Sequence, residues 1–156
     1  MLDWQLEGSS RVETIDLRTA SVVYTGSRAA AFQTRESFAG WSVNFQTEAP
    51  VRPLGYILHF AFHPGDVVPS DSPRFTVAVN RKGTVDLLGE AQVDLQRAAW
   101  QVVEIPLDDL AFQGPVESIV FAGSFGGTFY LDDVRLVPLP APLITAVLEE
   151  HSAAWV

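Results

Sequence analysis

The sequence predicts an all-β fold, an antiparallel sandwich or barrel, and two observations support this class. Short runs with apolar residues at every second position recur from Val12 to Val137, which is the period of a strand with one buried face. Turn-forming pairs such as Lys82-Gly83 and Gly126-Gly127 separate the runs. Eight or nine short strands within about 135 residues are typical of a sandwich or barrel.

Each predicted strand has one apolar face and one more polar face. In chain order the strands are Val12–Leu17, Ser27–Thr34, Trp41–Thr47, Tyr56–His63, Phe75–Asn80, Trp100–Leu107, Glu117–Gly123 and Thr128–Val137. In the fourth of these, Leu58, Phe60 and Phe62 occupy alternate positions. We expect such sets to fill the space between two sheets.

The composition limits the class of protein further. The chain has 156 residues, about the size of one domain. Its net charge is −9, and its ten Lys and Arg residues are scattered, so nucleic acid and anionic membranes are not expected partners. The absence of cysteine excludes disulfides, thiolate metal sites and cysteine nucleophiles. No run of about 18 apolar residues occurs, so no membrane-spanning helix is expected.

The composition changes at Pro138, where the stretch "PLPAP" begins. A proline-rich stretch of this kind favours an extended chain. We therefore expect residues 1–137 to form the sandwich. Residues 138–156 are expected to form a linker or tail, which could include a short helix.

The residues opposite the apolar positions are unusual, because many are uncharged and polar or small. Amides, hydroxyls and imidazoles donate and accept hydrogen bonds, which suits a neutral polysaccharide in a groove on one sheet face. A polar face partly covered by a loop would show the same pattern. The expected hydrogen-bonding residues, all on one outer surface, are Gln33, Asn44, Gln46, His59, His63, Thr76 and Asn80. Trp41 and Trp100 are the preferred residues for stacking on a sugar ring.

Four stretches of the chain resemble one known family. They are "VVYTGSRAAAFQ", "WQVVEIPLDDL", "IVFAG" and "GTFYLDDVRLV". Together they look like the jelly-roll carbohydrate-binding modules, galactose-binding-like β-sandwiches of secreted bacterial glycoside hydrolases, over about residues 4–137. The resemblance implies a jelly roll, non-catalytic binding of a plant-type or microbial polysaccharide, and a place in a larger secreted, extracellular protein.

The closing stretch has a fault in its alternation. Leu131 is apolar on one parity and Val134 on the other, with two acids between them. One extra residue at this point predicts a β-bulge. The resemblance implies a structural calcium ion here, with Asp132 as a carboxylate ligand, and calcium accepts the oxygen ligands that a bulge would present.

Two features depart from the family's pattern. Relatives often supply an acidic ligand from a first strand, and we recognise no such strand before Trp4. Asp3 or Glu7 would be the substitutes. Several relatives also have Trp in the middle strand at the position of Ala61, and an aromatic platform is usually the main source of sugar affinity.

An enzyme is a less favoured alternative. His59 and His63 share a face, but four residues of strand span roughly 13 Å, which is too far for one zinc ion. A glycosidase needs two carboxylates that face each other across a cleft. Asp108 and Asp109 are adjacent in the sequence, and so are Asp132 and Asp133, so neither pair can be arranged in this way. A polysaccharide lyase or hydrolase would be the nearest enzyme class. A structural or adhesive spacer of a secreted multidomain protein is the main alternative to sugar binding.

Overall fold

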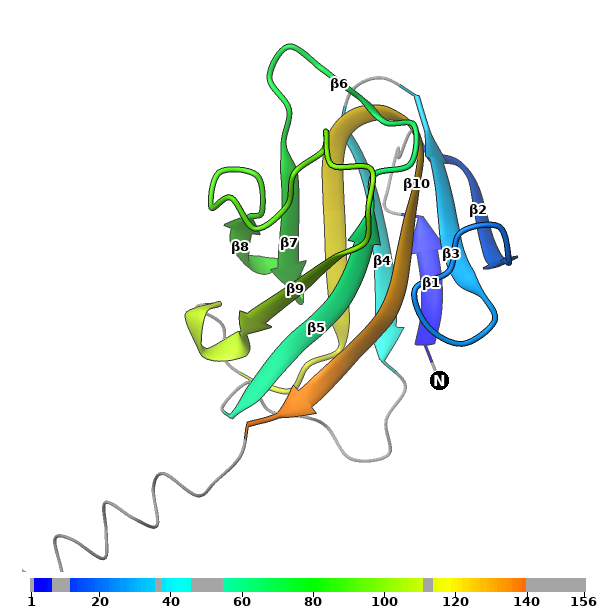
Figure 1. The fold of residues 1–156 in the computed structure, drawn as a ribbon. Helices are drawn as coiled ribbons and strands as arrows, with labels where there is room; N and C mark the ends of the chain where they lie inside the picture. The colour runs from blue at the N-terminus through cyan, green and yellow to red at the C-terminus, as the bar shows by residue number, and fades with distance from the viewer. Residues whose placement is uncertain (1, 7–11, 36–37, 46–54, 111–113, 140–156) are drawn as a thin grey trace, which may run out of the picture.

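The computed structural model describes residues 2–6, 12–35, 38–45, 55–110 and 114–139 (Figure 1). Within these residues the chain forms strands and one short 3-10 turn, and no α-helix. The elements are β1 (Leu2–Leu6), β2 (Val12–Thr19), β3 (Ala29–Thr34), β4 (Phe38–Phe45), β5 (Tyr56–His63), β6 (Val68–Pro69), β7 (Phe75–Val79), β8 (Lys82–Asp86), β9 (Gln101–Pro106), η1 (Leu107–Asp109) and β10 (Ser118–Pro138).

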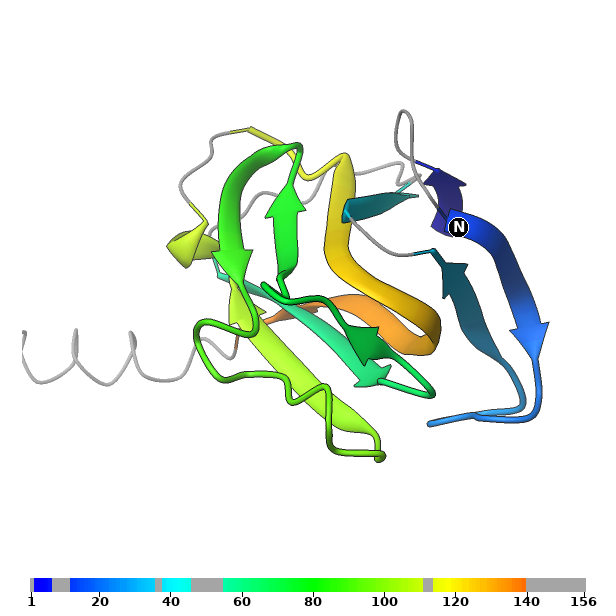
Figure 2. The ribbon, with the colours of Figure 1, turned by 90° about the horizontal axis from the view of Figure 1, so that it is seen from above.

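The strands form two antiparallel layers that share β10. Its first half, 118–124, lies between β4 and β7 in sheet A, which has the order β1-β4-β10-β7-β8. Its second half, 127–138, lies between β3 and β5 in sheet B, which has the order β2-β3-β10-β5-β9. Figure 2 shows β10 curving from one layer to the other. The predicted antiparallel sandwich of jelly-roll type is confirmed.

The turn predicted at Gly126-Gly127 is instead a bend within one long strand. The chain stays extended there and pairs with β6 on its way between the sheets. Gly127 has a φ of +112°, and an added Cβ would lie 2.9 Å from the backbone oxygen of Asp66. Glycine is therefore required because both the backbone angle and the nearby loop exclude a side chain. A glycine pair in the sequence cannot by itself distinguish such a bend from a hairpin turn.

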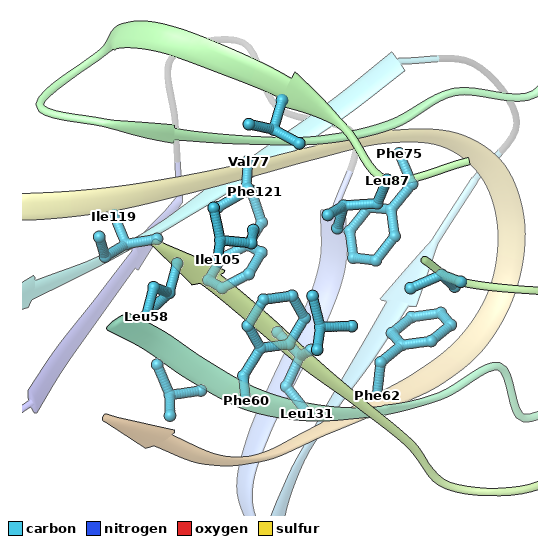
Figure 3. Packing of buried hydrophobic residues seen from close by; sticks show 14 of the residues in the cluster. Leu58, Phe60, Phe62, Phe75, Val77, Leu87, Ile105, Ile119, Phe121 and Leu131 are labelled. Carbon is cyan, nitrogen blue, oxygen red and sulfur yellow. The ribbon is translucent and has the colours of Figure 1, made fainter. Parts of the chain in front are cut away.

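The core lies between the sheets and consists of the alternating apolar sets. Leu58, Phe60 and Phe62 from sheet B have no exposed surface, and neither do Phe75 and Phe121 from sheet A. Figure 3 shows these side chains converging from the two layers. Burial of each such side chain contributes about 1.5–3 kcal/mol. The predicted inward parity is thus confirmed for these strands.

Two parts of the sequence-based prediction were wrong. A first strand is present, because Leu2–Leu6 pairs with β4 along its whole length. The turn after β7 lies at Asn80 and Arg81, which have φ values of +50° and +59°, so that Lys82 already begins β8. Asn tolerates this left-handed conformation better than most residues. The sequence-based prediction placed the turn at Lys82-Gly83 instead, because that pair is also typical of turns.

The predicted division at residue 138 is only partly within the described residues. Strand β10 ends at Pro138, and the Leu139 amide donates to the Gly55 carbonyl over 2.6 Å. Most of the predicted tail lies outside the described residues. In the part of the chain that the structure describes, no helix is long and apolar enough to span a membrane.

Candidate functional site

The predicted bulge is present in β10. The register between β10 and β5 shifts between Asp132 and Arg135, and Asp133 has a φ of +52°. A left-handed residue other than glycine costs roughly 1–2 kcal/mol. Tyr130, before the bulge, and Arg135, after it, lie opposite His63 and His59 on the outer face of sheet B. This outer face contains the candidate site.

Asp132 fixes a loop above this face. Its Oδ2 accepts hydrogen bonds from the amides of Tyr24 and Thr25, each 3.0 Å long, and its Oδ1 accepts the Asp133 amide at 2.7 Å. These bonds hold the loop between β2 and β3 against β10 (Figure 1). The sequence did not indicate this contact, because residues 24 and 132 are far apart in the chain.

The surroundings of Asp132 do not fit a calcium ligand. Calcium takes six to eight oxygen atoms, whereas three N–H donors point at this carboxylate. Within the described ranges, no group of three or more His, Asp or Glu side chains could hold a metal ion. Asp3, one suggested second ligand, lies in sheet A opposite Asn44, and Glu7 lies outside the described residues. The calcium site stays an untested prediction.

Four rings gather at one end of the outer face of sheet B, and we call them the aromatic cluster: Tyr24, His63, Trp100 and Tyr130. The ring centroids of Tyr24 and Trp100 are 5.6 Å apart. The centroid of the His63 ring is 5.4 Å from that of Trp100 and 6.0 Å from that of Tyr130. Tyr24 is 42% exposed and the other three are half-buried. The predicted residues His63 and Trp100 are thus brought together.

The cluster favours the neutral form of the His63 ring. Burial lowers the pKa of its imidazole. Its Nδ1 is 3.0 Å from the Gly65 amide, and an amide can only donate, so this nitrogen accepts. The proton of the neutral ring is therefore on Nε2, where it can be donated to a hydroxyl group.

A charged cluster occupies the same face farther along β5: His59, Glu104, Asp133 and Arg135. His59 Nδ1 is 3.0 Å from Glu104 Oε1, and its Nε2 is 3.0 Å from Asp133 Oδ2. The second contact is not aligned as a hydrogen bond, and Nε2 has no aligned partner among the described residues. Arg135 Nε lies 3.2 Å from Asp133 Oδ1. The side chains of Glu104 and Arg135 are 59% and 57% exposed.

Ala61 separates the two clusters. It faces outward between His59 and His63 yet has no exposed surface, so neighbouring groups cover it. His59 and His63 are about 13 Å apart along the strand. A ligand that contacts both clusters must therefore be longer than a single sugar ring.

The prediction that all the polar candidates share one surface was wrong. Gln33, His59, His63 and Trp100 belong to sheet B or its edge, whereas Trp41, Asn44, Thr76 and Asn80 belong to sheet A or its end. Alternation separates inward from outward side chains, but it does not say to which sheet a strand belongs. The sheets face opposite directions, so the two groups cannot line one groove.

The polar candidates of sheet A have structural contacts. Asn80 Oδ1 accepts the amides of Glu117 and Ser118, and its Nδ2 donates to the Pro115 carbonyl over 2.7 Å. Asn80 therefore holds the loop that leads into β10. The Thr76 hydroxyl donates to the Ala122 carbonyl over 3.4 Å.

The other predicted ligand residues are Trp41, Asn44, Gln33 and Gln46. Trp41 and Asn44 lie opposite Phe121 and Ser118 in the sheet A register. Gln33 is exposed on β3, on the same sheet as the two clusters. Gln46 lies outside the described residues.

Sequence reasoning missed Tyr24, Asp133 and Arg135 as site residues. Tyr24 lies in a loop without periodicity, and the contacts of the Tyr24 and Thr25 amides with Asp132 hold this loop beside Trp100. Asp133 was recognised as part of the bulge, but its left-handed conformation, which places its carboxylate next to His59, has no counterpart in the alternation.

Comparison with known proteins identifies the fold. No family model matches the sequence, and no curated protein does. The extra C-terminal domain of an exo-1,3/1,4-β-glucanase from a Pseudoalteromonas species has a TM-score of 0.61 at 15% identity, over 90% of this chain and 88% of that domain. The family 30 carbohydrate-binding module of a cellulosomal cellulase from Clostridium thermocellum has a TM-score of 0.54 at 16% identity, over 84% and 88% of the two chains.

A third solved structure is similar to the same extent. CBM27-1 of Caldicellulosiruptor saccharolyticus, in complex with mannohexaose, has a TM-score of 0.53 at 14% identity, over 86% of this chain and 89% of that one. The chain has the fold of the jelly-roll carbohydrate-binding modules. At these identities the similarity shows the fold alone, so the function rests on the site.

Proposed function

We propose that the chain is a non-catalytic module that binds a neutral polysaccharide on the outer face of sheet B, within a larger secreted protein. The observation that carries the proposal is the aromatic cluster, which the fold assembles from one loop and three strands or strand ends. Sugar rings stack on aromatic faces, and Tyr24 and Trp100 provide two adjacent rings at the surface.

The charged cluster suits the hydroxyl groups of the same chain. The carboxylates of Glu104 and Asp133 accept hydrogen bonds, and the Arg135 guanidinium donates them. Two carboxylates on this surface would repel a uronic acid polymer, and the net charge of −9 acts in the same direction. These groups therefore favour a neutral polysaccharide.

The similar structures support this ligand class and a multidomain setting. One was solved with mannohexaose, and two belong to a cellulase and a glucanase. In the full glucanase chain the matched region spans 19% of the length. A module of a secreted glycoside hydrolase would account for both the fold and the site.

Affinity electrophoresis on glucans, xylans and mannans tests the proposal. We expect at least one neutral polymer to retard the protein, and Trp100→Ala to reduce the retardation strongly. Thr76→Ala, on the opposite sheet, is the control and should migrate like the wild-type protein. Release of reducing sugar would indicate an enzyme instead. No retardation and no release would leave the structural or adhesive spacer.

A further inference from the structure

A hollow lies at the end of the sandwich, where β10 passes between the sheets, and we call it the crossover cleft. Its volume is about 1080 Å³, slightly above the usual range of about 300–1,000 Å³ for small-ligand sites. One wall includes Arg35, beyond β3, and the other consists of residues of the loop from Asp66 to Asp71. Gly126 and Gly127 line it from β10. None of its lining residues belongs to the aromatic or charged cluster.

Hydrogen bonds fix the shape of this cleft. The Asp66 amide donates to the Thr128 carbonyl, and Asp66 Oδ1 accepts the Thr128 amide. On the other wall the buried Thr34 hydroxyl donates to the Phe125 carbonyl over 2.8 Å. The required glycine at position 127 lets the Asp66 loop approach β10 closely. The walls are thus pre-organised, which reduces the entropy cost of binding a ligand.

The lining combines an apolar wall with hydrogen-bonding groups. Val68 is 69% exposed and the adjacent Pro69 is also exposed, which gives an apolar surface for the C–H groups of a sugar ring. Ser70 and Asp71 are exposed beside them. Asp66 can accept further bonds while it holds Thr128, because a carboxylate has about four acceptor positions.

We propose that the crossover cleft is a second sugar-binding site, which takes a neutral saccharide unit. The choice of a sugar as the ligand rests on the proposed function. The location of the site rests on the lining of the cleft alone. Two carboxylates against the single guanidinium of Arg35 disfavour an anionic sugar. Binding at two places on one module would increase retention on a polymer through the effective concentration of the second contact.

Amide chemical shifts of the full chain, titrated with mannohexaose and separately with cellohexaose, test this proposal. The Gly126 and Gly127 amides report on the cleft, and the His63 and Tyr130 amides report on the outer face of sheet B. We expect both sets to shift and saturate, with different concentration dependence. Trp100→Ala should remove only the shifts of the second set.

Two matched variants test the cleft directly. Ser70→Trp fills it and should abolish the glycine shifts, whereas Ser72→Trp changes an exposed residue outside the lining and should preserve them. The inference is overturned if only the outer-face amides respond, or if Trp100→Ala also removes the glycine shifts. A response of the glycines alone would overturn the proposed main site and support the cleft. No response at either set would overturn both.

Discussion

The two halves of β10 differ in regularity, although they are one continuous strand. The half in sheet A, 118–124, pairs in unbroken register with both neighbours, and its outward residues Ser118, Val120 and Ala122 are small and uncharged. The half in sheet B has a register shift and a left-handed aspartate. Its outward residues, Tyr130 and Arg135, belong to the two clusters of the candidate site.

The difference indicates that the irregular half serves the site as well as the core. Both halves bury their inward aromatic residues completely, as Phe121 and Phe129 show. The bulge lets both Leu131 and Val134 reach the core although they lie three residues apart, and its backbone strain costs roughly 1–2 kcal/mol. It also places Asp132 under the Tyr24 loop and Asp133 beside His59.

The largest expected effects test whether the two halves are equal in the core. Phe121→Ala and Phe129→Ala should each lower the free energy of unfolding by about 3–5 kcal/mol, because each removes a fully buried ring. Urea denaturation of both variants measures the two losses. A much smaller loss for Phe129→Ala would mean that the irregular half also packs less well, and the comparison would fail.

The second prediction concerns the bend that joins the halves. Gly127→Ala should lower the free energy of unfolding by about 2–3 kcal/mol, because the new methyl group adds backbone strain and overlaps with Asp66. Gly114→Ala is the matched control, with a φ of +104° and nothing within 4 Å of an added Cβ. It should cost about 1 kcal/mol, from strain alone. Equal losses in urea denaturation would show that the Asp66 loop yields to the new methyl group.

The third prediction separates the two acids of the bulge. Asp132→Asn replaces one acceptor oxygen by an amide donor that faces other donors, so we expect a loss of about 1–2 kcal/mol. Retention on the cognate polymer should also weaken, because Tyr24 is released from Trp100. Asp133→Asn should change stability by less than about 1 kcal/mol, since Asn tolerates a left-handed backbone. Equal effects of the two substitutions would contradict the distinct roles.

Excess chelator tests the calcium prediction for the same residue. Because N–H donors occupy the Asp132 carboxylate, we expect the thermal midpoint to be unchanged by chelator. A lower midpoint would instead support a bound cation, since a ligand of the folded state raises the midpoint.

Alternation in the sequence was sufficient to predict the core and the bulge. Phe60 and Phe62 face inward as expected, and the parity change around Asp132 corresponds to a real shift of register. The inward parity and the bulge depend only on the order of residues within one strand, and a period-two pattern shows that order directly. The fold class followed from them together with the turn signals.

The composition of the site could be predicted only in part. His63 and Trp100 were expected as ligand residues and lie together, but Asn44 is in the other sheet and Asn80 lies at the end of a strand of that sheet. Which strands pair is decided by contacts between distant segments, and a single strand's pattern does not contain that information. Tyr24 joins the cluster through its amide's contact with Asp132, which no local pattern encodes.

The smallest expected effect concerns the pH dependence of the irregular half. Burial lowers the pKa of His63 below the value of about 6.5 for an unfolded chain. The unfolded state therefore binds more protons between the two values, so the contribution of His63 to stability is complete above about pH 6.5 and is lost as the pH falls through the folded pKa. Thermal midpoints from about pH 7.5 downward should fall more for the wild-type protein than for His63→Gln, which cannot titrate. Parallel curves would show that this ring is as accessible to protons in the folded protein as in the unfolded chain, and that the aromatic cluster does not shield it.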